Sequence, residues 1–308
     1  MWIEPSDWTA TLSRRPLSAL GRQRTRVIYC FDTSAINRLV DDLEREPIVQ
    51  TLLAIGSFRI TAYNVIEVAK TTGEDRRTRL MSLLRRLSDG KRPLDRPNTI
   101  LLTYASAHAQ GASSAKVNAD ENLDGLWTAL NAPDLIDEEA RGEALTWASQ
   151  WEEDFSDVVA GDRNRFQALF QAAPTERPRT TAITLRAYLS KKGECRSLIG
   201  DVYQHQTGKP LTDSGYNVLV REPVWALYFV SYAYAIHQRS VRERNFSPNR
   251  NAGAVDLGQA VYLTMCDRFV TADRAQYRAL RLLNVLNKKR RTEVLEYDRF
   301  RTRLLVFP

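Results

Sequence analysis

One short apolar segment, VIYCFDTSAIN (Val27 to Asn37), constrains the fold more than any other part of this 308-residue chain. Its first five residues, Val27 to Phe31, are mainly β-branched or aromatic and too few for a helix of their own, which predicts a buried strand. The strand ends on Asp32, and a helical pattern follows it directly. A carboxylate in that position lies at the edge where open α/β sheets bind their ligands. The alternative is that Asp32 only caps the following helix.

The alternation of strand and helix recurs further along the chain. Thr61 is the expected N-cap of a helix over AYNVIEVAK. The pattern also predicts two short strands, a helix and a last strand: Ile100 to Thr103, Arg268 to Thr271, Arg274 to Leu286 and Glu293 to Tyr297. This alternation predicts an α/β fold with a mainly parallel sheet that is covered by helices on both faces.

Residues 104–244 differ from the rest, because helical patterns succeed one another there without strands. We expect a helical insertion or lobe. Its helix from Pro223 carries aromatic residues at helical spacing: Trp225, Tyr228, Phe229 and Tyr232. Such a stripe can stack on nucleic-acid bases. It is more often core, and we expect it to seat the added helices against the rest of the chain.

The charge balance favours an anionic partner. The net charge is +7, and 36 of the 44 basic residues are arginine, the side chain best shaped for bidentate phosphate contacts. Nucleic acid is therefore the favoured partner class, although a coding bias toward arginine would give the same composition. The basic lead-in over residues 1–26 is expected to be a solvated flank rather than an arm that contacts phosphates.

The cysteines and the apolar runs bear on the cellular compartment. The three cysteines are far apart and form no CxxC pair, which excludes a disulfide framework and a zinc pattern and fits a reducing cytoplasm. The longest apolar stretch, Val224 to Ile236, has thirteen residues, whereas a membrane span needs roughly 20. We expect a soluble, cytoplasmic protein with no membrane partner.

Four carboxylates share one kind of position, at a strand end or in the first turns of a helix: Asp32, Glu67, Asp256 and Asp273. Strand ends and helix N-termini meet on the same edge of a parallel sheet, so the four could converge there. At about 4 Å each like-charged pair costs roughly 1 kcal/mol in water and several times more in a partly buried cleft. Such a cluster is reasonable only with a cation, and oxygen ligands select Mg²⁺ or Mn²⁺. One or two such ions could activate a water and orient a phosphodiester.

These motifs resemble the PIN-domain (PIN-like) nucleases. The matching features are the strand that ends in Asp32-Thr33-Ser34, Glu67 within ITAYNVIEVAK, Asp256 opening an apolar helix, and FVTAD ending on Asp273. The order of the acids and the 17-residue step from Asp256 to Asp273 also follow the family. The resemblance implies a compact three-layer α/β/α fold and metal-dependent hydrolysis of phosphodiester bonds, usually in RNA.

The resemblance also assigns roles to individual residues. It implies that the four acids are metal ligands and that the hydroxyls of Ser34 and Thr271 orient carboxylates or water. Asp267 offers a fifth acid, but we expect it to cap the turn into the strand at Arg268. The matching core covers residues 27–103 and 245–308, so that 189 residues separate Glu67 from Asp256. The helices between them could restrict access, bind a particular RNA or hold an inhibitory partner.

The leading hypothesis is a Mg²⁺- or Mn²⁺-dependent nuclease, in particular an endoribonuclease that acts on single-stranded or structured RNA. Many compact members of the family are toxins held by an antitoxin, so the resemblance also suggests a toxin or phage-defence effector and leaves a homo-oligomer open. The alternatives are a nucleic-acid-binding protein of the same fold that cleaves nothing, and a nuclease directed at DNA or flaps. The sequence contains no GxSxG, Walker or GxGxxG motif, which disfavours serine-hydrolase and nucleotide chemistry.

Overall fold

The computed structural model describes most of the chain: residues 26–111, most of 153–170, 178–191, 193–242, 252–288 and 292–306, with isolated residues between 130 and 150. The basic lead-in expected over residues 1–26 lies outside the described residues, apart from Arg26. None of the helices in the described part is long and apolar enough to cross a membrane.

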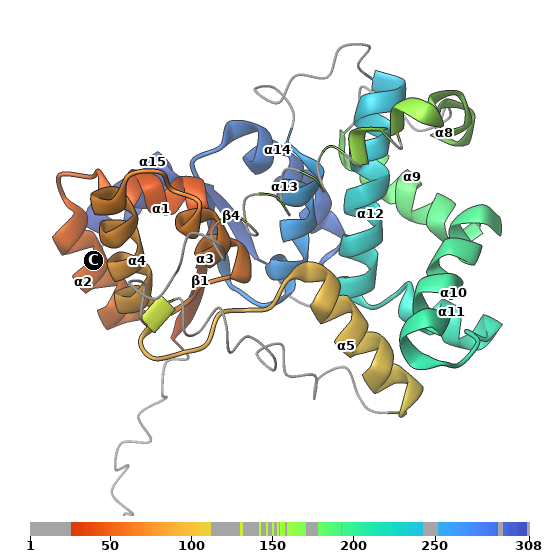
Figure 1. The fold of residues 1–308 in the computed structure, drawn as a ribbon, viewed down its shortest axis with the longest axis horizontal. Coiled ribbons are helices and arrows are strands. Elements are labelled where there is room, and N and C mark those ends of the chain that lie inside the picture. The colour runs from red at the N-terminus through yellow and green to blue at the C-terminus, as the bar shows by residue number, and fades with distance from the viewer. Residues whose placement is uncertain are drawn as a thin grey trace, which may run out of the picture.

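The centre of the fold is a sheet of four parallel strands (Figure 1), and pairing between the strands gives the order β2-β1-β3-β4. The strands are β1 Val27–Phe31, β2 Gly56–Arg59, β3 Arg268–Thr271 and β4 Glu293–Glu296. The expected first and last strands and the strand at 268–271 are therefore confirmed. Because all four strands run the same way, their carboxyl ends lie at one edge of the sheet, as the sequence pattern predicted.

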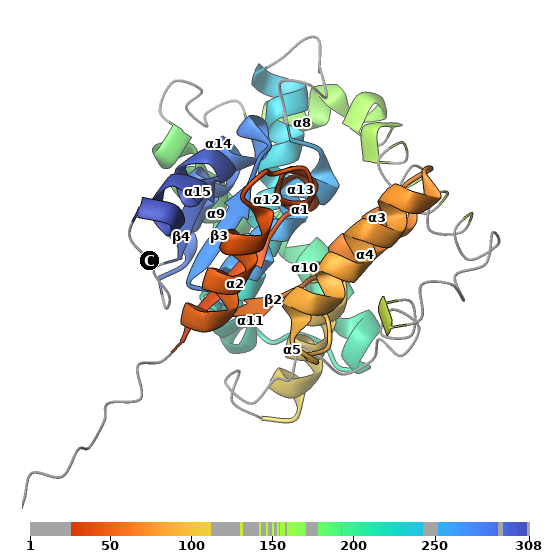
Figure 2. The same ribbon diagram turned by 90° about the vertical axis from the view of Figure 1, so that its left-hand side faces the viewer.

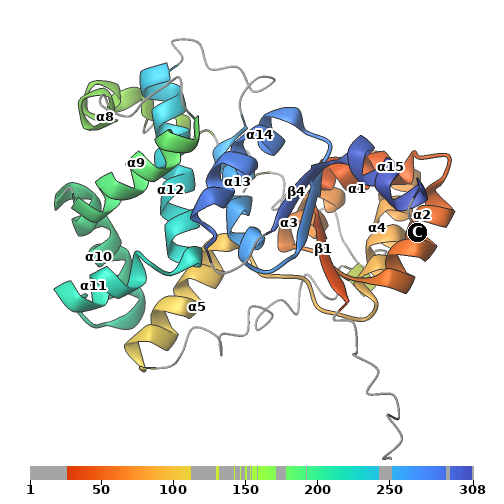
Figure 3. The ribbon, with the colours of Figure 1, turned by 180° about the vertical axis from the view of Figure 1, so that it is seen from behind.

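Helices cover both faces of this sheet. One face packs against a layer of four helices, which faces the viewer in Figure 2. These helices are α1 Thr33–Val40, α2 Arg45–Ile55, α4 Glu74–Ser88 and α15 Tyr297–Val306. The opposite face is covered by α5 Pro97–Ala109, α12 Pro223–His237, α13 Ala254–Gly258 and α14 Arg274–Leu283, with the strands between the two layers in Figure 3. The helix α3 Ala62–Ala69 contributes side chains to both cores.

The strand side chains alternate between the two cores, as the period of two in an extended chain requires. One core takes Tyr29, Phe31, Val270 and Leu295. The other takes Cys30, Phe269 and Val294. Both faces of the sheet are therefore dry, which explains why these strands are continuous apolar runs rather than alternating ones.

The middle of the chain packs onto the second core as further helices: α8 Arg163–Phe170, α9 Pro178–Lys191, α10 Gly193–Thr207 and α11 Asp213–Leu219. Helix α12 joins them to the sheet side, since it contacts α5 and α9 as well as α13. Trp225 and Phe229 of its aromatic stripe are buried and stacked, with 5.5 Å between ring centroids. The expectation that this stripe is core is confirmed for these two residues.

One strand expected from the sequence is wrong. Residues 100–103 lie inside α5, where Pro97 occupies the first turn, a position that suits its fixed φ angle. Ile100, Leu101 and Ala105 are buried on one side of this helix. A short apolar run does not by itself distinguish a strand from a buried helix. The apolar helix that Asp256 was expected to open is also modified, because α13 continues as the 3₁₀ helix Gln259–Thr264.

Candidate metal centre

Asp32 lies where β1 ends and α1 begins. Its backbone N–H donates to the carbonyl of Val270 (2.9 Å), which extends the pairing of β1 with β3 by one residue. Its Oδ2 accepts the backbone N–H of Ser34 (3.0 Å), so Asp32 is the N-cap of α1. The capping role that the sequence left open is therefore present in the structure. The side chain is also 5 % exposed, and a cap alone does not require such burial.

Three side chains add further donors to the Asp32 carboxylate. The Thr271 hydroxyl lies 3.3 Å from Oδ2. The amide Nε2 atoms of Gln259 and Gln276 lie 3.2 and 3.5 Å from Oδ1. Together with the Ser34 N–H, these give four donors, about as many as one carboxylate can accept. Asp32 is thus oriented from both oxygens by protein groups of β3, the 3₁₀ helix and α14.

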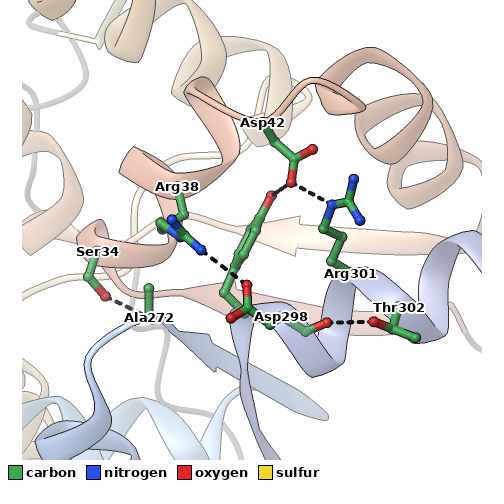
Figure 4. Close-up of polar contacts among 8 residues, drawn as sticks. Ser34, Arg38, Asp42, Ala272, Asp298, Arg301 and Thr302 are labelled. Atoms are coloured by element: carbon green, nitrogen blue, oxygen red, sulfur yellow. Dashed lines mark hydrogen bonds and ion pairs between the residues drawn. The ribbon is translucent and has the colours of Figure 1, made fainter.

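Asp273 occupies the corresponding position after β3. It is the N-cap of α14, since its Oδ1 accepts the backbone N–H of Gln276 (2.8 Å). The Ser34 hydroxyl accepts the N–H groups of Ala272 (2.9 Å) and Asp273 (3.1 Å), and it lies 3.2 Å from the Thr271 hydroxyl. Figure 4 includes the contact between Ser34 and Ala272. The two hydroxyls predicted beside the first and last acids therefore link the ends of β1 and β3.

A buried asparagine fixes α3 against the end of β1. Thr61 and Asn64 form a capping box: the Thr61 hydroxyl accepts the Asn64 N–H (3.2 Å), and Asn64 Oδ1 accepts the Thr61 N–H (2.9 Å). The expected N-cap at Thr61 is confirmed. Asn64 Nδ2 also donates to the carbonyl of Phe31 (3.0 Å) and to the Thr33 hydroxyl (3.2 Å). These bonds hold the second turn of α3, which carries Glu67, close to Asp32.

Glu67 carries the electrostatic signature of the site. Burial raises its pKa to about 8, and the negative charges of Asp32 and Asp256 add to this rise. A hydrogen bond with Thr33 and the charge of Lys70 oppose the rise without cancelling it. Asp32, Glu67 and Asp256 therefore lie close enough for their charges to interact. Lys70 is half-buried beside them, and burial lowers its pKa.

Asp256 lies in the first turn of α13, where its Oδ2 accepts the backbone N–H of Gly253 (3.1 Å). It is partly exposed, as are Glu67 and Asp273. Asp267, the fifth acid of the sequence, lies apart from all of these. Asp267 directly precedes β3, and its Oδ2 accepts the N–H of Ile28 in β1 (2.8 Å). It therefore links β1 to β3 at the opposite edge of the sheet.

The four acids do not surround a single point. In the described parts of the chain, no group of three or more Asp, Glu, His or Cys side chains is arranged to hold a metal ion. The nature of the donors nevertheless fits Mg²⁺ or Mn²⁺. Mg²⁺ keeps several waters and is usually bound by only one or two carboxylates. The site offers oxygen ligands alone, and the mutual repulsion of Asp32, Glu67 and Asp256 would be relieved by a cation.

Sequence reasoning missed three residues of this site, namely Asn64, Gln259 and Gln276. A signal for the two glutamines exists, because each follows an acid by three residues, in Asp256-x-x-Gln259 and Asp273-x-x-Gln276. Residues three apart on a helix lie on the same side, so both amides share the side of their acid.

A second polar group near the end of α1 is structural. Asp42 Oδ2 accepts the Tyr297 hydroxyl (2.9 Å) and the Nε–H of Arg301 (2.8 Å), and thereby fastens α15 to α1 (Figure 4). An exposed ion pair between Arg38 and Asp298 (3.2 Å) joins the same two helices. These contacts stabilise the packing of α15 against α1 and do not involve the acids of the candidate site.

Comparison of the chain with protein-family models, with curated proteins and with solved structures finds no match in any of the three.

Proposed function

We propose that this protein is a Mg²⁺- or Mn²⁺-dependent nuclease of PIN-like fold, and specifically an endoribonuclease. The observation that carries the proposal is the burial of Glu67 beside the negative charges of Asp32 and Asp256, which together raise its pKa to about 8 at the ligand-binding edge of a parallel sheet. Three carboxylates that repel one another in a partly buried cleft are stable together when a cation compensates them. The PIN-like motifs of the sequence and the all-parallel sheet support the same fold.

Each residue of the site would have a separate role in the cleavage reaction. Asp32, Glu67, Asp256 and Asp273 would supply the negative charge that holds the cation, with one or two of them as direct ligands; the ion would supply a Lewis acid that activates water and stabilises the leaving oxygen. Glu67 keeps its proton at neutral pH without a cation and releases it from the carboxyl group when a positive charge is present. Lys70, half-buried next to Glu67, offers an ammonium group to a phosphate of the substrate.

A basic helix face beside the site favours a nucleic-acid backbone as the substrate. Helix α14 starts at Asp273 and contains no acidic residue. Its exposed residues are three arginines, Arg274, Arg278 and Arg281, spaced so that they share one face. Within the described residues, none of them pairs with a carboxylate; Arg281 donates to the Tyr277 hydroxyl (3.0 Å). Arginines without acidic partners are suited to phosphates.

One observation favours a second function, a nucleic-acid-binding protein of the same fold that cleaves nothing. Both oxygens of Asp32 already accept protein donors, and one oxygen of Asp273 is used in a helix cap. A site in which acids serve only as caps would bind nucleic acid through the arginines of α14 and need no cation. Cleavage of DNA or flap structures is a third outcome, which the choice of substrate in the experiment resolves.

The experiment is a cleavage assay on single-stranded RNA and DNA oligonucleotides in Mn²⁺, Mg²⁺ or EDTA. Wild type is compared with Asp32→Asn and Asp256→Asn, and with Asp75→Asn, an exposed acid on α4, as the matched control. We expect RNA cleavage that requires the cation, persists in the control and is lost in both site variants. Cleavage that survives Asp32→Asn or EDTA would refute the proposal. Expression of wild type and of Asp32→Asn in bacteria, with growth as the readout, tests the toxin or defence role.

A further inference from the structure

Two buried glutamines approach the same oxygen of Asp32 from different helices. Gln259 is the first residue of the 3₁₀ helix and Gln276 lies in the first turn of α14. Each side chain is 1 % exposed. Their Nε2 atoms lie 3.2 and 3.5 Å from Asp32 Oδ1, at or beyond the long end of the range for N–H···O hydrogen bonds.

The amide oxygens of the same two glutamines are the unexplained feature. Both Oε1 atoms are buried, and within the described part of the chain neither accepts a hydrogen bond. Each oxygen shares its amide carbon with the nitrogen that donates to Asp32, so it also lies close to that carboxylate. A buried amide oxygen without a partner is unfavourable and calls for a water, an ion or another group that the amide can bind.

The surroundings indicate which partner would fit. The group that both amides contact is the Asp32 carboxylate, which in its ionised form accepts hydrogen bonds and donates none. The nearby hydroxyls of Ser34 and Thr271 are already engaged with each other, with Asp32 and with the backbone after β3. A hard divalent cation binds carboxylate and amide oxygens alike, and so would satisfy both kinds of group at once.

We propose that Gln259 and Gln276 are ligands of the cation, and that they supply neutral amide oxygens beside the carboxylates. Their N–H groups contact Asp32 Oδ1 at long distances, and their Oε1 atoms would be the oxygens that face a bound cation. The proposal rests on the proposed function, since it concerns the same cation. Neutral ligands complete the ion's coordination without adding to the repulsion among the acids.

The test is Mn²⁺ binding to the full chain without nucleic acid, followed by the electron paramagnetic resonance of free Mn²⁺. The variants are Gln259→Met and Gln276→Met, which keep a similar volume and remove the amide. Gln204→Met, on an exposed position of α10, is the matched control. We expect each site variant to raise the Kd for Mn²⁺ about tenfold or more, the usual size of such losses around metal sites, and the control to leave it unchanged.

Two further measurements keep the outcomes separate. Water-proton relaxation of bound Mn²⁺ should increase in at least one site variant, because water replaces the lost amide oxygen; a purely structural glutamine would not change it. If a Met variant fails to fold in EDTA, Gln→Asn at the same position withdraws the amide by one methylene and should weaken binding similarly. Unchanged or tighter Mn²⁺ binding in the glutamine variants would overturn the inference alone. Failure of wild type to bind Mn²⁺, or equal binding by Asp32→Asn, would overturn the proposed function with it.

Discussion

The burial of Glu67 beside Asp32 and Asp256 predicts that the protein loses stability as the pH rises, and that the variant Glu67→Gln lacks this loss. The pKa of Glu67 is about 8 in the folded protein, against 4.5 for an unperturbed side chain. Between these values the unfolded chain has lost the proton that the folded chain keeps, so stability falls as the pH rises. Below pH 4.5 the penalty is absent, and above pH 8 it is complete.

The magnitude follows from the same pKa. The free energy of unfolding falls by about 1.4 kcal/mol for each pH unit in this window, or by up to about 4 kcal/mol between pH 5 and pH 8. For a chain of this length about 1 kcal/mol corresponds to roughly 2 °C, so the Tm should fall by up to about 8 °C. Glutamine has the same shape and does not ionise, so Glu67→Gln should lack this part of the fall.

The assay is thermal unfolding in EDTA at several pH values for wild type, Glu67→Gln and the control Glu74→Gln, an exposed glutamate on α4. The difference in Tm between wild type and Glu67→Gln should grow with pH, while the control follows wild type. Adding Mn²⁺ should flatten the wild-type profile, because a cation favours the ionised carboxylate. Parallel profiles of wild type and Glu67→Gln in EDTA would show that folding does not raise the pKa of Glu67, and would refute the reasoning.

Two further predictions concern surfaces away from the acids. In the background of Asp32→Asn, Arg278→Gln and Arg281→Gln should each weaken binding of a fluorescent single-stranded RNA. Each should also reduce the slope of log K against log salt by about 0.7, as expected for one lost phosphate contact. Arg221→Gln, at an exposed position next to α12, is the control, and an equal loss of binding there would refute phosphate binding by the basic face of α14. Asp42→Asn should lower the free energy of unfolding by about 1–2 kcal/mol in urea, because it weakens the contacts with Tyr297 and Arg301; an unchanged midpoint would contradict this structural role.

Local signals predicted the elements that carry the acids. The apolar run before Asp32 and the one before Asp273 are strands in the structure, and Thr61 caps α3, because strand patterns and N-cap chemistry depend on neighbouring residues. The prediction of a strand at residues 100–103 was wrong because contacts distant in sequence determine the structure there. Four apolar residues fit a strand or a buried helix equally well, and the decision comes from packing of α5 against α12 and α10.

The glutamines of the site show what sequence reasoning could not supply. Gln259 and Gln276 meet Asp32 across 227 and 244 residues. Glutamine is common on helix surfaces and has no charge, so the Asp-x-x-Gln spacing places each amide on the side of its own acid but does not indicate burial next to Asp32. These amides reach Asp32 because β1 pairs with β3 and because α13 and α14 both start at the same edge of the sheet. Gln259 directly follows α13, and Gln276 lies in the first turn of α14.

The alternatives posed by the sequence, that Asp32 is a helix cap or part of a metal site, do not exclude each other. Asp32 caps α1 through Oδ2 and meets the glutamines through Oδ1. Asp273 caps α14 through Oδ1, and Asp256 accepts the Gly253 N–H through Oδ2. With one oxygen fixed on a backbone N–H, the rotation of each carboxylate is set and its second oxygen has a defined direction.

The separate roles of the two Asp32 oxygens determine how the variant Asp32→Asn should behave. Asparagine caps a helix about as well as aspartate, since its side-chain oxygen accepts the same N–H. Asp32→Asn should therefore keep the cap of α1, and its NH₂ group can bond the unpartnered Oε1 atoms once the glutamine amides turn over. We therefore expect the fold to persist with a Tm in EDTA close to that of wild type. Loss of Mn²⁺ binding in that variant would then report the missing charge and not a missing cap. A variant that unfolds instead would mean that the Asp32 charge stabilises the protein without a cation, and the argument from repulsion would be wrong.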